Sequence, residues 1–227
     1  MTVQLLRATT TVHREAIRKQ SGPYDILYGA APQQILWRTG SSRLLAHLPN
    51  DGTSISVLDA GCGDGCNAVE LERRGFDVVG VDVSQLALRG LRNRFARARI
   101  NPRGRYERKD VRTFLSVDRK FDVLLSTGLF QCLERPTRIA VHRRLQRCVR
   151  PGGLVLFSCL TDEIPLPNDH KTPNISLATF DELKRLFKGW EVLSEIKSQI
   201  DDAHEPLVRP HRHSVSWIVA RKPLAAR

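Results

Sequence analysis

One stretch of sequence decides the fold: Val57-Leu58-Asp59-Ala60-Gly61-Cys62-Gly63-Asp64-Gly65-Cys66-Asn67. Its apolar start is typical of a buried strand, and a helical pattern follows over about residues 66–74. The glycines between them allow a tight turn and a close approach of a ligand to the backbone. The stretch therefore predicts a strand, a ligand-binding turn and a helix in immediate succession.

Away from this turn, short β-branched runs alternate with amphipathic helices. We predict further strands at 78–81, 106–109, 123–126 and 154–159, and helices at 84–98, 135–148 and 179–187. Such alternation is typical of βαβ units, whose parallel strands are buried on both faces of the sheet. The last two predicted strands, around 190–198 and 213–221, have no helix between them. They indicate an antiparallel hairpin.

Two acidic residues follow the second and third predicted strands. Asp82 lies 82 − 61 = 21 residues after Gly61 and ends the run Val78-Val79-Gly80-Val81. An acid at this place binds both hydroxyls of a ribose. Asp110 closes the next strand, where its side chain could accept a hydrogen bond from an adenine amino group with the Val111 backbone nearby. These positions predict a nucleoside-containing cofactor.

The residues around the turn favour S-adenosylmethionine over NAD. In the dinucleotide pattern G-x-G-x-x-G the third glycine would fall at position 66, which is Cys66, while the glycine comes one residue earlier as Gly65. Asp59 stands two residues before the first glycine. A carboxylate there would repel a pyrophosphate but attract an amino group. We therefore expect a cofactor with an amino acid moiety.

With Asp59, Asp82, Asp110 and Pro151-Gly152-Gly153 in this order, the sequence resembles the class I S-adenosylmethionine-dependent methyltransferases over roughly residues 53–160. The resemblance implies an α/β, Rossmann-like fold with a seven-stranded, mostly parallel sheet, an antiparallel C-terminal strand and helices on both faces. It implies S-adenosyl-L-methionine as cofactor and S-adenosyl-L-homocysteine as product. The cofactor-binding residues expected on this basis are Asp59, Gly61, Cys62, Gly63, Asp82, Val83, Asp110, Val111 and Ser126.

Later segments look like the tellurite-resistance (TehB-like) methyltransferases, namely 121–127, 145–153, 180–184, 189–192 and 218–222. This resemblance implies a small-molecule acceptor with an oxygen, nitrogen or sulfur-type nucleophile. The family carries a His-Arg pair before its last strand, whereas His204 is followed by Glu205. Positive charge returns only at Arg209, His211, Arg212 and His213. The departure argues against an oxyanion such as tellurite as the acceptor.

The chain is expected to divide into an N-terminal helical lid segment at 1–50 and a cofactor-binding domain at 51–227. Candidate catalytic residues are Tyr24 and Tyr28 in the lid, and His204 as a general base, since histidine titrates near neutral pH. His211 and His213 are alternatives for the same role. The tyrosines are equally consistent with packing of a helix on the sheet edge, and each histidine with an ordinary loop position.

The charge is strongly positive, with 36 Lys and Arg against 24 Asp and Glu and a net charge of +12. Its densest run extends from Arg89 to Arg108 and could track phosphates. Helical spacing of Leu88, Leu91 and Phe95 within it favours a solvated helix face instead. No aromatic residues interleave the arginines as base stacking would require. The positive charge keeps an RNA methyltransferase open as an alternative, although a nucleic acid partner is not favoured. A non-catalytic cofactor-binding homologue is a second alternative.

The remaining composition limits the class of protein. No apolar run approaches the roughly 18 residues that span a bilayer, and the N-terminus has no secretory pattern, so we expect a cytoplasmic protein without a membrane partner. The 5 cysteines are an odd number without zinc-site spacing, which favours reduced thiols and no metal site. We expect a monomer or a homodimer.

Overall fold

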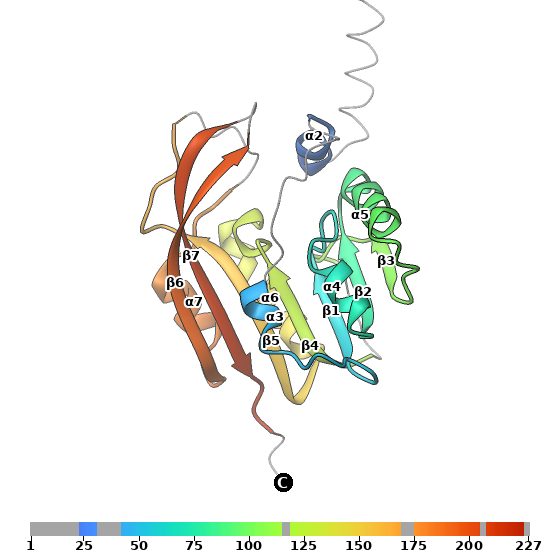
Figure 1. Cartoon of the computed structure of the whole chain (residues 1–227). Coiled ribbons are helices and arrows are strands. Elements are labelled where there is room, and N and C mark those ends of the chain that lie inside the picture. Colours follow the sequence, from blue (N-terminus) through green and yellow to red (C-terminus); the bar gives the residue numbers. More distant parts are fainter. Residues whose placement is uncertain (1–22, 31–41, 115–118, 169–174, 205–207, 225–227) are drawn as a thin grey trace, which may run out of the picture.

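A seven-stranded sheet organises the chain, with strand order β3-β2-β1-β4-β5-β7-β6 (Figure 1). The structure, a computed structural model, describes residues 23–30, 42–114, 119–168, 175–204 and 208–224. The strands are β1 (Ser56–Ala60), β2 (Asp77–Asp82), β3 (Arg105–Arg108), β4 (Phe121–Thr127), β5 (Val149–Thr161), β6 (Glu191–His204) and β7 (Val208–Arg221). Strands β1 to β5 pair in parallel, while β7 is antiparallel to both β5 and β6. The predicted sheet is confirmed.

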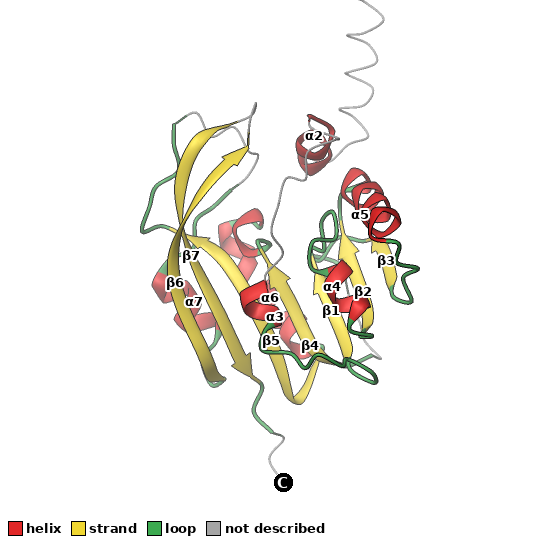
Figure 2. Cartoon of the chain, viewed as in Figure 1, coloured by secondary structure: helices red, strands yellow, loops and turns green. Residues whose placement is uncertain are grey.

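Helices cover both faces of the sheet (Figure 2), as predicted. They are α2 (Pro23–Ala30), α3 (Ser42–Leu45), α4 (Ala68–Arg73), α5 (Gln85–Ala98), the 3-10 turn η1 (Phe130–Cys132), α6 (Arg135–Arg147) and α7 (Phe180–Leu186). Leu44 of α3 shares a core with Val57 of β1, whereas Leu145 of α6 packs with the next residue, Leu58. Successive strand residues point to opposite faces. We call the face of the sheet that packs against Leu44 the α3 face, and the face that packs against Leu145 the α6 face.

The C-terminal hairpin is much longer than predicted. Pairing of β5 with β7 ends at Thr161 and Ser214, but β6 and β7 stay paired as far as His204 and Val208. The hydrophobic pattern stops near residue 213 because this extension lies beyond the neighbouring strand. Polar side chains face one another across the extension instead, as in the 2.9 Å ion pair between Arg212 and Asp201. The hairpin therefore projects past the carboxyl ends of the parallel strands (Figure 1).

The N-terminal segment is described only in part. Residues 1–22 and 31–41 lie outside the described ranges, and so does Trp37, which we expected in the lid segment together with Tyr24 and Tyr28. In α3, Leu44 and Leu45 are 1% and 2% exposed and belong to the core, although they fall in the predicted lid segment. The boundary at residue 50 stays a prediction. Within the described ranges, every helix is too short or too polar to cross a membrane.

Candidate active site

The turn after β1 needs its glycines. Gly61, Gly63 and Gly65 have φ angles of 74°, 55° and 84°, in the left-handed region that side chains other than glycine rarely adopt. The Gly61 N–H donates to Val81 O at 2.8 Å, which ties the turn to β2. A Cβ on Gly63 would lie 2.8 Å from the Tyr28 hydroxyl. The turn thus places bare backbone at the carboxyl edge of the sheet, directly beneath α2.

Asp82 ends β2 and is held in place by two backbone groups. Its Oδ2 accepts from the Gly63 N–H at 2.9 Å, and its Oδ1 accepts from the Ser84 N–H at 2.8 Å. Burial raises the pKa of Asp82, and these hydrogen bonds act in the opposite direction. Each carboxylate oxygen can accept more than one hydrogen bond. The carboxylate is therefore an oriented acceptor suited to a pair of hydroxyls.

Asp59 is a buried carboxylate without a hydrogen-bond partner among the described residues. It is 1% exposed, and neither Oδ1 nor Oδ2 accepts a hydrogen bond there. Burial, with the charge of Asp82, raises the pKa of Asp59 to about 7. Buried polar groups are nearly always satisfied in folded proteins, so an unpaired one indicates a missing donor. An amino group would supply that donor and fits the cofactor predicted from the sequence.

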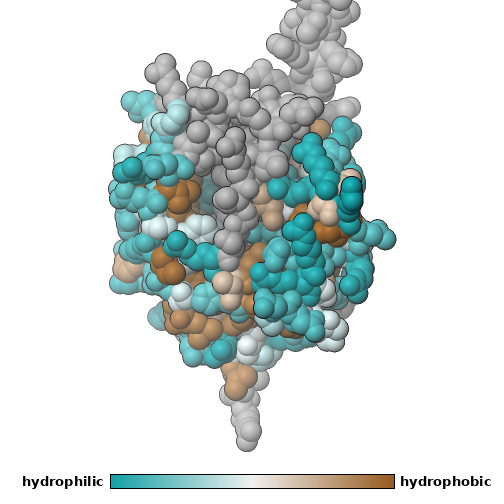
Figure 3. Space-filling view, viewed as in Figure 1, coloured by the Kyte–Doolittle hydropathy of each residue, from teal (hydrophilic) through white to brown (hydrophobic). Residues whose placement is uncertain are grey.

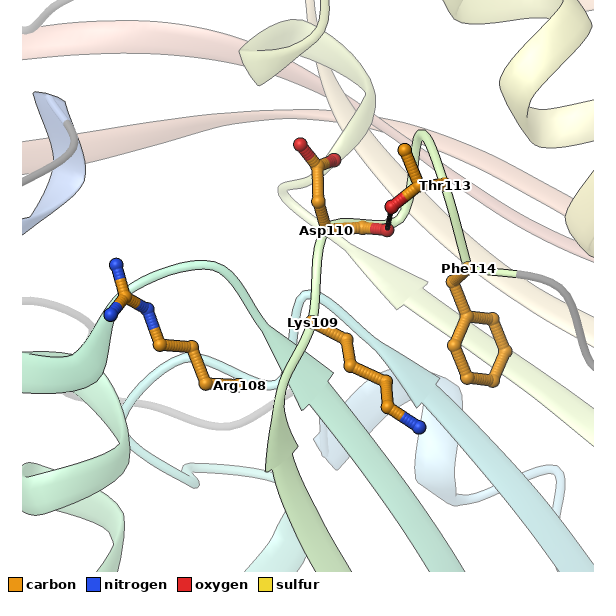
Figure 4. Close-up of a pocket in the computed structure, with 5 residues that line it drawn as sticks. All are labelled: Arg108, Lys109, Asp110, Thr113 and Phe114. Atoms are coloured by element: carbon orange, nitrogen blue, oxygen red, sulfur yellow. Dashed lines mark hydrogen bonds between the residues drawn. The ribbon is translucent and has the colours of Figure 1, made fainter.

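The segment after β3 forms one wall of a pocket of about 460 Å³, lined by Arg108, Lys109, Asp110, Thr113 and Phe114 (Figure 4). The strand ends at Arg108, so Asp110 lies two residues beyond it rather than at its end. Its carboxylate accepts from the Arg112 side chain, which holds the pKa of Asp110 below its usual value. Its role as adenine acceptor stays a prediction.

Three other predicted cofactor residues differ in their surroundings. Val83 follows β2 and is 37% exposed, so it offers an apolar surface beside Asp82. Val111 is buried in the core on the α6 face. The Cys62 thiol packs with residues of α4 and α5, and burial raises its pKa well above its usual value. Of these three side chains, only that of Val83 is exposed enough for a ligand to reach.

Ser126 lies on the α6 face and is not brought together with Asp59 and Asp82. Its hydroxyl is fully buried and hydrogen-bonds to Nε2 of His142 at 2.9 Å. Its neighbour Thr127 instead meets the glycine turn, because its hydroxyl accepts from Asn67 Nδ2 at 3.0 Å. Sequence reasoning missed Thr127 and Asn67. In the structure Val123 is on the α3 face, and Thr127, four residues further along β4, points to the same face.

The candidate catalytic residues occupy different places. The Tyr24 hydroxyl donates to Cys132 O at 3.0 Å, and burial raises its pKa, so the phenol keeps its proton. The Tyr28 hydroxyl lies over Gly63. His204 ends β6, but its side chain lies outside the described part. On β7, Nε2 of His211 and Nε2 of His213 are 2.8 Å apart, and His213 is 2% exposed.

A methyltransferase domain family matches residues 57–153. An uncharacterized methyltransferase of Mycobacterium bovis is 39% identical over 142 residues, which are 62% of this chain and 68% of that protein. The chain belongs to the S-adenosylmethionine-dependent methyltransferases. This membership confirms the resemblance found in the sequence and S-adenosylmethionine as the cofactor.

In the described ranges, no group of three or more side chains suited to a metal ion comes together.

Two further known proteins are similar to this methyltransferase. The probable S-adenosyl-L-methionine-dependent methyltransferase TehB of Haemophilus influenzae is 27% identical over 157 residues, 66% of this chain and 50% of TehB. The chain thus spans about half the length of this relative. The crystal structure of the N-methyltransferase NodS of Bradyrhizobium japonicum, in complex with S-adenosyl-L-homocysteine, has a TM-score of 0.66 at 17% identity, covering 88% of this chain and 98% of NodS. The latter similarity establishes the fold.

Proposed function

We propose that this methyltransferase transfers the methyl group of S-adenosylmethionine to a small-molecule acceptor. The observation that supports the cofactor part of this proposal is the buried Asp59 carboxylate near Asp82, which has no hydrogen-bond partner among the described residues. A 2-heptyl-1-hydroxyquinolin-4(1H)-one methyltransferase of Mycobacteroides abscessus, 26% identical over 152 residues (64% of this chain, 66% of that protein), supports an acceptor of this size.

Different residues of the site would bind different parts of the cofactor. Asp59 would hold its amino group, Asp82 the ribose hydroxyls, and Asp110 with the Val111 backbone the adenine. When bound, the cofactor supplies a methyl group on a sulfonium, which is a strong electrophile. The chain then has mainly to hold the acceptor close and aligned, an effect that provides much of the rate in such displacements. The helix α2 over the turn would exclude water.

The acceptor would bind above the carboxyl ends of β1, β4 and β5, since ligands of open α/β sheets bind there. The projecting hairpin would wall this space on the side of β7. Val57 of β1 and Val219 of β7 both belong to the core of the α3 face. Residues an even number of positions apart in a strand point to the same face, and Asp59 is two positions from Val57 while His213 is six positions from Val219. His213 and Asp59 therefore share a face. The pair His211 and His213 is a candidate to take a proton from a hydroxyl or ammonium acceptor.

The direct test is a screen of small metabolites with isotopically labelled S-adenosylmethionine. We expect one metabolite to become labelled, with one labelled methyl group transferred for each molecule of S-adenosylhomocysteine formed. Calorimetry with S-adenosylhomocysteine and with NAD accompanies it. No heat with the sulfur nucleoside, or tight binding of NAD, would contradict the proposal.

Replacing Asp82 with alanine is expected to weaken the affinity for S-adenosylhomocysteine by about 1.5–3 kcal/mol, because a charge-assisted hydrogen bond is lost. Calorimetry measures this change. The matched control is Asp77→Ala at the opposite end of β2, where an exposed carboxylate pairs with Arg119 and is remote from the turn. Equal affinity of a folded Asp82→Ala variant and the wild type would place the ribose elsewhere.

The arginine run bears on the RNA alternative. Leu88, Leu91 and Phe95 bury one face of α5, and Arg89, Arg92 and Arg97 are exposed on the other. Hydrophilic residues make up most of the visible surface around α5 (Figure 3). Between 50 and 200 mM salt we expect RNA affinity to fall by a factor of about 10³ in a filter-binding titration, because exposed guanidinium groups bind through counterion release. Nanomolar binding in physiological salt, with methylation of that RNA, would favour the alternative.

A further inference from the structure

A single carboxylate joins α2 to the rest of the fold near the cofactor-binding turn. Asp25 is 5% exposed, although it lies on a short helix at the edge of the molecule. Its Oδ1 accepts from the Ser84 hydroxyl and from the Leu86 N–H, the latter at 3.1 Å. Both donors belong to the first turn of α5 or its N-cap. No local sequence pattern indicates this contact, because the two partners are 59 positions apart.

Ser84 stands between two carboxylates. Its hydroxyl donates to Asp25 and accepts from the Ala87 N–H at 3.0 Å, which is the usual N-cap contact. Its backbone N–H donates to Oδ1 of Asp82 at 2.8 Å. Movement of Ser84 would therefore disturb the carboxylate that is expected to bind the ribose.

The second oxygen of Asp82 is also reached from α2. Its Oδ2 accepts from the Gly63 N–H at 2.9 Å, and the Tyr28 hydroxyl lies over Gly63. Asp25 and Tyr28 are three residues apart on one helix, so they lie on the same side of α2. The two backbone donors that orient Asp82 are therefore both next to α2. Gly63 lies beside Tyr28, and Ser84 lies beside Asp25.

The opposite side of the site is reached by the same helix. Tyr24, one residue before Asp25, donates to the Cys132 carbonyl in η1, which follows β4. The helix therefore contacts the β2 side of the sheet through Asp25 and the β4 side through Tyr24. A bound cofactor would lie beneath a helix fastened on both sides.

We infer that Asp25 is a positioning residue for cofactor binding, which ties closure of α2 to the placement of the Asp82 carboxylate through Ser84. The inference rests on the proposed function, because it assigns Asp82 to the cofactor. Release of the product nucleoside would require the contact between Asp25 and Ser84 to break. Closure of α2 and retention of the cofactor are then one event.

A simpler role would make Asp25 only an additional cap for α5. The two roles differ in what they change. Loss of a cap lowers the thermal midpoint of unfolding but leaves the dissociation rate of a bound nucleoside alone. Loss of a positioning contact speeds that dissociation and frees α2 even without the nucleoside.

The test compares Asp25→Ala with Thr179→Ala. Thr179 is the N-cap of α7, remote from the turn, and its side chain accepts from the Glu182 N–H in a capping box. Each variant should lower the thermal midpoint by about 2–4 °C. For Asp25→Ala we expect dissociation of S-adenosylhomocysteine to be at least about tenfold faster, since a hydrogen bond to a charged group is lost. Thr179→Ala should match the wild type, and Asp25→Asn, which keeps an acceptor oxygen, should stay within about threefold of it.

Hydrogen exchange of the α2 amides in the cofactor-free protein provides a readout independent of activity. We expect faster exchange in Asp25→Ala than in Thr179→Ala. Equal exchange and equal dissociation in these two variants would overturn the inference and leave the proposed function intact. A wild type that binds neither sulfur nucleoside would overturn the proposed function, and with it the role of Asp25 toward the cofactor. Accelerated exchange in Asp25→Ala would then show only a fastening contact.

Discussion

Replacing Arg138 with methionine is expected to lower the free energy of unfolding by about 3–5 kcal/mol. Arg138 of α6 is fully buried and donates through Nε to Oε1 of Glu182 at 2.9 Å. It also donates to the carbonyls of Ser176 and Leu177, which precede α7. The substitution leaves the buried Glu182 carboxylate without its main partner. Urea denaturation followed by circular dichroism measures the change.

A neighbouring arginine provides the control. Arg135 lies 3.4 Å from the same carboxylate, but its side chain is 52% exposed. Exposed ion pairs contribute little, so Arg135→Ala should cost less than about 1 kcal/mol. The double variant Arg138→Met, Glu182→Leu should recover much of the loss, because no charge is left buried. If Arg138→Met and Arg135→Ala lost the same unfolding free energy, burial of the ion pair would not determine how much it stabilises the fold.

The effect of Arg138 should also depend on pH. Burial raises the pKa of Glu182, but hydrogen bonds from Arg138 and Thr179 outweigh burial and lower it to about 2. A carboxyl group whose pKa is lower in the folded state stabilises the fold above its unfolded pKa of about 4.3. This contribution is lost as the pH falls towards 2. The difference between wild type and Arg138→Met should therefore shrink over that interval.

Local patterns predicted the cofactor half of the sheet because its signals are local. The β-branched runs of β1 and β2 and the glycines between them each specify a conformation within a few residues. The end of β4 was harder to interpret. Its continuous run Val123-Leu124-Leu125 is apolar on both faces, so it does not show which face Ser126 occupies. A shift of one residue reverses the face, which is why Thr127 was missed.

Contacts between distant segments were out of reach of these patterns. The sequence offers no signal that Asp25 meets Ser84, because the contact depends on how α2 packs on α5. The hairpin itself was predicted, but its outer extension was missed, since the charged residues of that extension carry no hydrophobic alternation. By contrast, Asp59 was predicted from charge alone. The structure adds that Asp59 is buried and has no hydrogen-bond partner within the described part of the chain, which is the property that makes it informative.

Replacing Asp59 with asparagine is expected to stabilise the cofactor-free protein while weakening its cofactor binding. The pKa of Asp59 is about 7 in the folded state, well above the usual value of 3.8. The folded protein therefore holds a proton that the unfolded chain has already lost between about pH 4 and 7. Its stability falls as the pH rises through this interval. Asparagine does not titrate and removes that loss.

Urea denaturation at pH 5 and pH 8 measures the effect. Relative to wild type, Asp59→Asn should gain about 3 kcal/mol of unfolding free energy between these two pH values, since each pKa unit corresponds to about 1.4 kcal/mol. Asp77→Asn, at the exposed end of β2, is the control and should show no such gain. If the difference in unfolding free energy between wild type and Asp59→Asn were the same at pH 5 and pH 8, Asp59 would be ionised and paired in the folded protein.

Cofactor affinity should respond in the opposite sense. Ionisation of Asp59 near pH 7 provides the charge that an ammonium group would pair with, so wild-type affinity for S-adenosylhomocysteine should rise as the pH increases through 7. Asp59→Asn should bind about 10–100-fold more weakly at pH 8, because the charged hydrogen bond is lost, and with a flatter pH profile. The same carboxylate would then weaken the empty fold and strengthen the loaded one. Calorimetry that finds unchanged affinity in the stabilised variant would assign the cofactor's amino group to another residue.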